Sequence, residues 1–183
     1  MFVILLADGF EEIEALTPLD MLRRAGADIK TVSISDEKTV TGSHGISVSA
    51  DLKRDELDLS TVEFAIFPGG MPGAKNLDES EFTDKVIDAV NKSDGRLAAI
   101  CAAPMILGHR GLLNGKKACC YPGFEKELYG ANVVYNSCVT DGNITTARGM
   151  GAALEFAEEL IKLSFGKELC EKISSSIIHE VKK

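Results

Sequence analysis

The feature that most constrains this chain is a series of short, largely apolar runs, each followed by a loop and then by a helical pattern. The clearest runs are residues 2–6, 62–67 and 97–100. An apolar run of this length predicts a strand covered on both faces. Because parallel strands need crossover connections, strands that alternate with helices predict an α/β fold with a mostly parallel sheet and helices on both faces.

The other elements are predicted from periodicity and from stop signals. Residues 14–25 carry leucines at helical spacing and end before Gly26, which predicts a helix. The polar stretch 36–54 predicts an excursion from the sheet. We further predict a strand over 29–34, a hairpin at Asp141-Gly142 with a strand over 144–146, and helices over 82–90, 102–109, 152–163 and 167–181. No repeat or linker divides the chain, so one domain over residues 1–183 is expected.

Composition argues against several function classes. Twenty-eight Asp and Glu against 20 Lys and Arg give a net charge of −8, which disfavours nucleic-acid partners and anionic membranes. The apolar start is short and lacks preceding basic residues, so we expect a cytoplasmic protein rather than a secreted or membrane-spanning one. Five irregularly spaced cysteines fit reduced thiols, and the scattered histidines argue against a structural zinc site.

The loop after the predicted strand at 97–100 carries the strongest chemical signal. Cys101 stands between strand and helix, with Ala99 two positions before it and Ala103 two positions after it. This is the steric pattern of a nucleophile elbow, a turn so tight that the neighbours of the nucleophile must be small. The start of the helix would favour the thiolate. The alternative is a core cysteine packed among alanines.

A glycine pair follows the neighbouring strand. Gly69 and Gly70 would let the backbone come close to a ligand, and the N–H groups of Gly70 and Ala102 could together stabilise an oxyanion. The alternative is a plain turn. Neither a phosphate-binding P-loop nor a dinucleotide fingerprint is present, so no cofactor is expected.

Charged residues occupy the remaining loops. Glu11, Glu12 and Glu14 are expected to be solvated unless one is buried beside the cysteine, where it would stay protonated and donate a hydrogen bond to the thiolate. Their spacing alone does not identify which one. Arg148 could bind an anion, cap a helix or form an ordinary salt bridge. His44 is expected on an exposed loop.

Taken in order, these motifs resemble the ThiJ/PfpI superfamily, and most closely its DJ-one (Parkinson-disease protein, ThiJ-like) branch. The resemblance covers nearly the whole chain. It implies a flavodoxin-like three-layer sandwich of the class I glutamine amidotransferase type and, usually, a homodimer. Its markers are ADGFEEIE at 7–14, PLDMLRRAG at 18–26, FPGG at 67–70, NL at 76–77, AAICAAP at 98–104 and TARG at 146–149.

The resemblance also implies roles and activities. Cys101 matches the reactive cysteine, Glu14 its hydrogen-bonded carboxylic acid, and Gly70 and Ala102 the backbone donors. The implied activity is cofactor-free hydration of small α-oxoaldehydes such as methylglyoxal or glyoxal, of the glyoxalase III type, or deglycation. The implied alternative is a redox-sensing stress-response or chaperone-like protein that works through oxidation of Cys101. If the chain dimerises, we expect the first helix near residues 17–24 to contribute apolar surface.

Three positions depart from the family pattern. Tyr121 stands where branch members often carry a histidine, and a phenol is a poor general base near neutral pH. Ala102 stands where the protease-like branch has a histidine, so protease activity is not expected. His44 occupies the place of a branch arginine that helps to bind anions, which leaves the anion selectivity of the site open.

Overall fold

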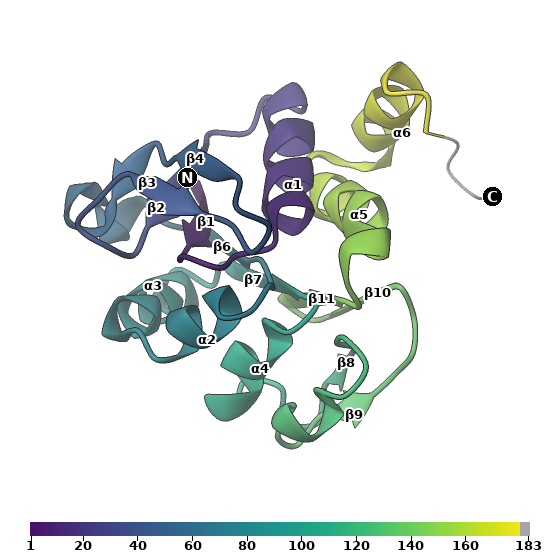
Figure 1. Cartoon of the computed structure of the whole chain (residues 1–183). Coiled ribbons are helices and arrows are strands. Elements are labelled where there is room, and N and C mark those ends of the chain that lie inside the picture. The colour runs from purple at the N-terminus through teal and green to yellow at the C-terminus, as the bar shows by residue number, and fades with distance from the viewer. Residues whose placement is uncertain (180–183) are drawn as a thin grey trace.

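Seven strands form one sheet in the order β10-β11-β7-β6-β1-β2-β5 (Figure 1). The structure is a computed structural model that describes residues 1–179. Every neighbouring pair is parallel except β10 and β11, which form the predicted hairpin. The strands are β1 (Phe2–Leu6), β2 (Ile29–Ser33), β5 (Leu52–Lys53), β6 (Phe64–Phe67), β7 (Arg96–Ile100), β10 (Cys138–Asp141) and β11 (Ile144–Ala147).

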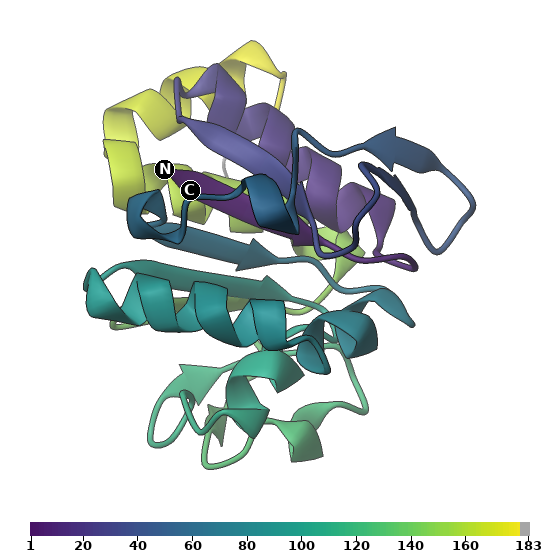
Figure 2. The same ribbon diagram turned by 90° about the vertical axis from the view of Figure 1, so that its left-hand side faces the viewer.

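Helices cover both faces of this sheet, which confirms the predicted fold class (Figures 1 and 2). One layer contains α1 (Glu12–Arg24), α5 (Ala153–Phe165) and α6 (Lys167–Ser176). The other contains α2 (Gly73–Asp78), α3 (Glu81–Lys92) and α4 (Pro104–His109). Within residues 1–179, no helix combines the length and the apolar character needed to cross a membrane.

The central strand β1 shows why the apolar runs are continuous. Val3 and Leu5 pack into the core on the α3 side, whereas Ile4 and Leu6 pack into the core on the α1 and α5 side. All four are fully buried. Because successive side chains of a strand point to opposite faces, a sheet covered by two helical layers needs apolar residues at every position.

Some element boundaries differ from the prediction. Helix α1 begins at Glu12 because the Glu11 carboxylate accepts the Glu14 N–H at 2.9 Å and caps the helix. The helix predicted over 167–181 ends at Ser176, and Val181 lies outside the described residues. The stretch 36–54 is an excursion only in part: it holds a separate hairpin of β3 (Thr39–Thr41) and β4 (Ser47–Ser49) but returns to the main sheet as its edge strand β5. A second small sheet pairs β8 (Lys117–Ala118) with β9 (Asn132–Val133).

Candidate active site

Cys101 occupies a strained turn at the carboxyl end of β7. Its φ is 66°, in the left-handed region that side chains other than glycine rarely adopt, so the predicted elbow geometry is confirmed. The Cys101 N–H donates to the carbonyl of Ala147 at 2.9 Å, and its own carbonyl accepts the N–H of Tyr121 at 2.8 Å. Contacts to two other segments therefore fix the turn and hold the cysteine above the sheet.

The glycine pair after β6 lies directly against this turn. A Cβ atom on Gly69 would fall 2.6 Å from Glu14 Oε2 and 2.7 Å from Cys101 Cβ, so only glycine allows this approach. The backbone N–H groups of Gly70 and Ala102 face the Cys101 sulfur and lower the pKa of its thiol, which favours the thiolate. The two donors predicted from the sequence are thus brought together at the sulfur.

Glu14 is the glutamate buried beside the cysteine. Its residue surface is 1% exposed, and Oε2 accepts the Gly69 N–H at 3.0 Å. Its other oxygen, Oε1, is buried and has no hydrogen-bond partner among the described residues. Burial raises the pKa of Glu14 to about 7, helped by the charge of nearby Glu11, while the neighbouring Cys101 thiol and the hydrogen bond from the Gly69 amide lower it in part. This carboxyl group is therefore protonated in a large share of molecules near neutral pH.

The thiol does not show the acidity expected from a helix start. Burial, followed by the negative charge of Glu14, raises the pKa of Cys101 to about 12, and the amides of Ala102 and Gly70 offset only part of this. Between these two pKa values the Cys101–Glu14 pair holds one proton. Moving that proton from sulfur to carboxylate forms the thiolate without changing the charge of the pair, so the two groups act as a unit.

The other two glutamates correct the expectation that they are solvated. Glu11 is 9% and Glu12 4% exposed. The Glu12 carboxylate accepts the backbone N–H of His44 at 2.8 Å and lies 2.9 Å from His44 Nδ1. Although burial opposes ionisation, these hydrogen bonds lower the pKa of Glu12 to about 2, and the same contact raises the pKa of His44.

His44 itself lies on the exposed turn between β3 and β4, as predicted. Within residues 1–179, Glu11, Glu12 and His44 form a group whose potential metal-ligand atoms all lie within 4.8 Å of one another. Each already has a structural role, because Glu11 caps α1 and Glu12 pairs with His44. We therefore assign no metal to this group.

Tyr121 and Arg148 lie on the two segments that hold the Cys101 turn, since the Tyr121 N–H donates to the Cys101 carbonyl and Arg148 follows Ala147, whose carbonyl accepts the Cys101 N–H. Tyr121 is 51% exposed, and its ring lies against Gly149, where an added Cβ would meet Tyr121 Cδ2 at 3.3 Å. The Arg148 guanidinium lies over the ring of Tyr135, 5.8 Å from its centre. Sequence reasoning missed Tyr135, because nothing in its neighbourhood marks it. It also missed the Met150 amide, which hydrogen-bonds toward Glu14.

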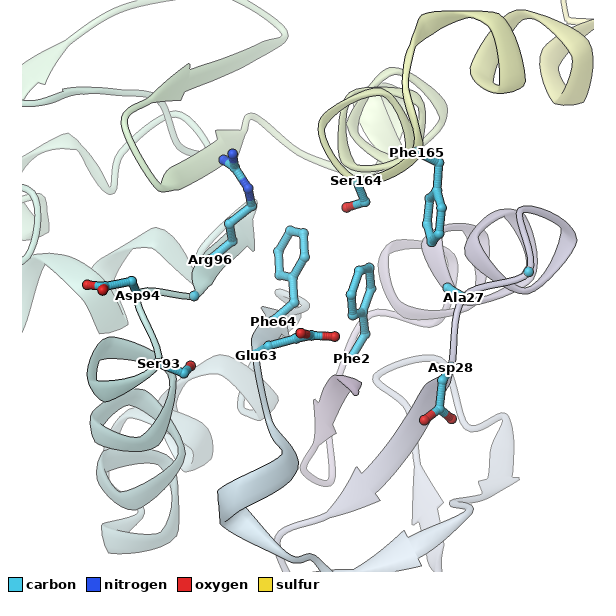
Figure 3. Close-up of a pocket in the computed structure, with 12 residues that line it drawn as sticks. Phe2, Ala27, Asp28, Glu63, Phe64, Ser93, Asp94, Arg96, Ser164 and Phe165 are labelled. Carbon is cyan, nitrogen blue, oxygen red and sulfur yellow. The ribbon is translucent and has the colours of Figure 1, made fainter.

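A separate cavity of about 440 Å³ opens at the other edge of the sheet (Figure 3). Phe2, Phe64 and Arg96, which line it, are the first residues of β1, β6 and β7. In parallel α/β sheets the chemistry lies beyond the carboxyl ends of the strands. None of the groups around Cys101 reaches this cavity, and we do not assign the active site to it.

The fold and the turn at Cys101 together define a class: flavodoxin-like α/β proteins that place a cysteine on a strained strand-to-helix turn. The chain belongs to the DJ-1/PfpI family, whose sequence model matches residues 2–163. This confirms the resemblance found in the sequence.

Individual relatives agree with this assignment. Protein DJ-1 homolog A of Arabidopsis thaliana is 38% identical over 180 residues, which are 96% of this chain and 46% of that protein. A deglycase of Pyrococcus horikoshii is 30% identical over 88% of this chain and 97% of its own length. The structure of oxidised Toxoplasma gondii DJ-1 superposes with a TM-score of 0.94 at 32% identity, covering 98% of both chains. The chain spans less than half the length of the Arabidopsis relative.

We predict that Cys101 is the first of the five thiols to be oxidised. Cys119, Cys120 and Cys170 are buried, and the thiol of the half-buried Cys138 has no pair of amide donors like those of Gly70 and Ala102. Those donors would stabilise the negative charge of a sulfenate or sulfinate. Peptide mass spectrometry after graded peroxide treatment of the folded protein should find added oxygen on Cys101 first. Earlier modification of any other cysteine would contradict the prediction.

Proposed function

We propose that the chain is a cofactor-free cysteine enzyme that acts on small α-oxoaldehydes such as methylglyoxal and glyoxal. The observation that carries the proposal is the pairing of Cys101 with Glu14. The buried Oε1 of Glu14 has no hydrogen-bond partner among the described residues. An acid at this place can give and take protons at a carbon bound to the sulfur. The amides of Gly70 and Ala102 supply the donors that an oxyanion requires.

The proposed reaction begins when Cys101 passes its proton to Glu14 and the thiolate adds to the aldehyde carbon. The carbonyl electron pair moves to oxygen, which takes that proton from Glu14, so that a hemithioacetal forms and Glu14 is again a carboxylate. Glu14 then moves a proton from the former aldehyde carbon to its neighbour through an enediol, which leaves a thioester. Water hydrolyses the thioester, releases the hydroxy acid and restores the thiol. The net reaction adds one water to the oxoaldehyde and needs no electron acceptor.

Deglycation fits the same chemistry. Two relatives from Pyrococcus species, each 30% identical to this chain, bear the name deglycase. The early adducts of an oxoaldehyde with protein thiols or amines are in equilibrium with the free aldehyde. An enzyme that consumes the aldehyde therefore also removes the adducts, and a direct attack on the adduct would use the same Cys101 nucleophile.

The second candidate function is redox sensing through Cys101. One observation favours it: the 32% identical Toxoplasma gondii protein was solved in an oxidised state. The amide donors that would hold a reaction oxyanion would also hold the oxygens of a cysteine sulfinate. Both functions use the same sulfur, so only turnover separates them.

Lactate formation from methylglyoxal in the absence of glutathione tests the proposal. We expect Cys101→Ser to lower the rate by about three orders of magnitude, because the nucleophile is lost. Cys138→Ser is the matched control, since Cys138 is also half-buried and burial likewise raises its pKa to about 12. Equal rates for wild type and Cys101→Ser would refute the enzyme proposal and leave redox sensing as the function of this site.

We also propose the homodimer that the family resemblance implies, with a surface that differs from the one expected from the sequence. Leu19, Met21 and Leu22 of α1 are buried against their own chain, so residues 17–24 offer no large apolar patch. Ile13, which is 47% exposed, is the large exposed apolar side chain at the start of this helix. We place it in the interface.

We expect sedimentation at micromolar concentration to show a dimer and Ile13→Asp to shift the protein toward monomer, because a buried interface disfavours an unpaired charge. Tyr129→Asp, an equally exposed position that lies beside His109 of α4, is the control and should leave the dimer unchanged. A monomeric wild-type protein would rule out the dimer.

A further inference from the structure

A cavity of about 400 Å³ adjoins the site between the segment after β8 and the turn after β11. Two tyrosines form its walls: Tyr121 is 51% exposed and Tyr135 is 71% exposed. Met150, 52% exposed, adds an apolar side chain. Exposed aromatic rings beside a cavity offer flat contact surface for a ligand at low entropic cost.

Gly149 connects this cavity to the reacting groups. A Cβ atom on Gly149 would lie 3.9 Å from both Cys101 Sγ and Glu14 Oε1, and 3.3 Å from Tyr121 Cδ2. One backbone position therefore borders the nucleophile, the acid and the cavity wall. A molecule whose carbonyl carbon is bonded to Cys101 would extend its remaining atoms past Gly149 into the cavity.

The charged residue that lines the cavity is positive, whereas the protein as a whole is negative. The chain carries a net charge of −8, yet no aspartate or glutamate lines this cavity and Arg148 does. Among the described residues, Arg148 makes no ion pair, unlike the arginines at 23, 24, 54 and 110. Arg148 is half-buried and its guanidinium lies over the ring of Tyr135, a favourable cation–π position that leaves its N–H donors free for a ligand.

We infer that Arg148 is a carboxylate-binding subsite beside Cys101. The preferred carbonyl substrates are then oxo compounds that carry a carboxylate, which the guanidinium binds through two parallel hydrogen bonds while the apolar atoms between lie on Tyr121. Tyr121 and Tyr135 act as positioning residues for the chain and for the guanidinium. The substrate class rests on the proposed function, whereas the subsite itself does not require turnover.

Alkylation of Cys101 by two small reagents of opposite character tests the subsite. In each case the thiolate attacks the carbon that bears iodine, a carbon–sulfur bond forms, and iodide leaves with its electron pair. Iodoacetate carries a carboxylate, and iodoacetamide is its neutral counterpart. The ratio of their second-order rate constants, measured at Cys101 by peptide mass spectrometry, reports the preference of the site for an anion and cancels the intrinsic reactivity of the thiol.

We expect Arg148→Gln to lower this ratio about fivefold, and Arg148→Lys to keep part of it, since lysine retains the charge without the fork. Arg96→Gln is the matched control, because Arg96 is also free of ion pairs within residues 1–179 and lies at the opposite edge of the sheet (Figure 3). In the wild type, raising salt from about 0.02 to 0.5 M should lower the ratio several-fold, a measurement that needs no variant.

An unchanged ratio in Arg148→Gln would overturn the subsite. A salt-independent ratio in the wild type would overturn it as well, even if the variant fails to fold. Neither result depends on catalysis, so absence of lactate formation would refute the proposed function while leaving the alkylation ratio to decide on Arg148. Lactate formation with a flat ratio would support the enzyme and refute the subsite.

Discussion

Replacing Gly70 with alanine is expected to lower the free energy of unfolding by about 2–4 kcal/mol, because positive φ costs an L side chain about 1 kcal/mol and overpacking costs about 1–3 kcal/mol. Gly70 has a φ of +86°, and a Cβ there would lie 2.3 Å from the Glu11 nitrogen and 2.6 Å from the Gly9 carbonyl oxygen. Both neighbours are backbone atoms, which cannot move aside as a flexible side chain can. Urea denaturation followed by circular dichroism measures the loss.

Gly26→Ala is the matched control for this prediction. Gly26 has nearly the same φ, +82°, but nothing lies within 4 Å of its ideal Cβ position. It should therefore lose only the conformational part, about 1 kcal/mol. The difference between the two variants measures how tightly the loop after β6 is pressed against the loop after β1. Equal losses would mean that this loop yields and that the backbone donor at Gly70 is not rigidly placed.

The fold was predictable where a single physical signal dominates. The apolar run at β1 requires cover on both faces, and the helical spacing of α1 and the Asp141-Gly142 turn are local properties. The short helix α2 escaped prediction, since its six residues span less than two turns and carry no repeated apolar spacing. The start of α1 escaped because the cap is a glutamate, which is not among the preferred capping residues.

The candidate site was predictable in its turns and unpredictable in its burial. Cys101 and Gly70 could be predicted as site residues because only small residues are tolerated near a tight turn. The distinction among the three glutamates depends on which carboxyl group the folded chain buries beside Cys101 with one oxygen left without a partner. Glu12 finds His44, which lies 32 positions away in the sequence, and no local pattern indicates that contact. The raised pKa of Cys101 follows likewise from burial and not from its position before α4.

The second large effect concerns the pH dependence of stability. Burial raises the pKa of Glu14 from 4.5 to about 7 in the folded chain. The folded state therefore binds this proton more tightly than the unfolded state does, so the stability contribution is fully present below pH 4.5 and is lost as pH rises toward 7. We expect the wild type to lose about 2–3 kcal/mol relative to Glu14→Gln between pH 5 and pH 8, by the linkage relation.

Glutamine isolates this effect because it keeps the size of the side chain and an oxygen that can accept the Gly69 N–H, but does not ionise. The wild-type-minus-variant difference removes the contributions of Glu12, whose pKa is lowered to about 2, and of His44, whose raised pKa is common to both proteins. The pKa of Cys101, raised to about 12 by burial and in part by the charge of Glu14, lies above this pH range, so Cys101 stays a neutral thiol in the wild type. Urea denaturation at several pH values measures the difference. A difference that is flat between pH 5 and 8 would place the Glu14 pKa near its unfolded value and would remove the acid from the proposed reaction. A difference that falls by about 2–3 kcal/mol from pH 5 to pH 8, together with loss of lactate formation in Glu14→Gln, would mean that the chain gives up stability at neutral pH to keep a proton-transferring carboxyl group beside Cys101.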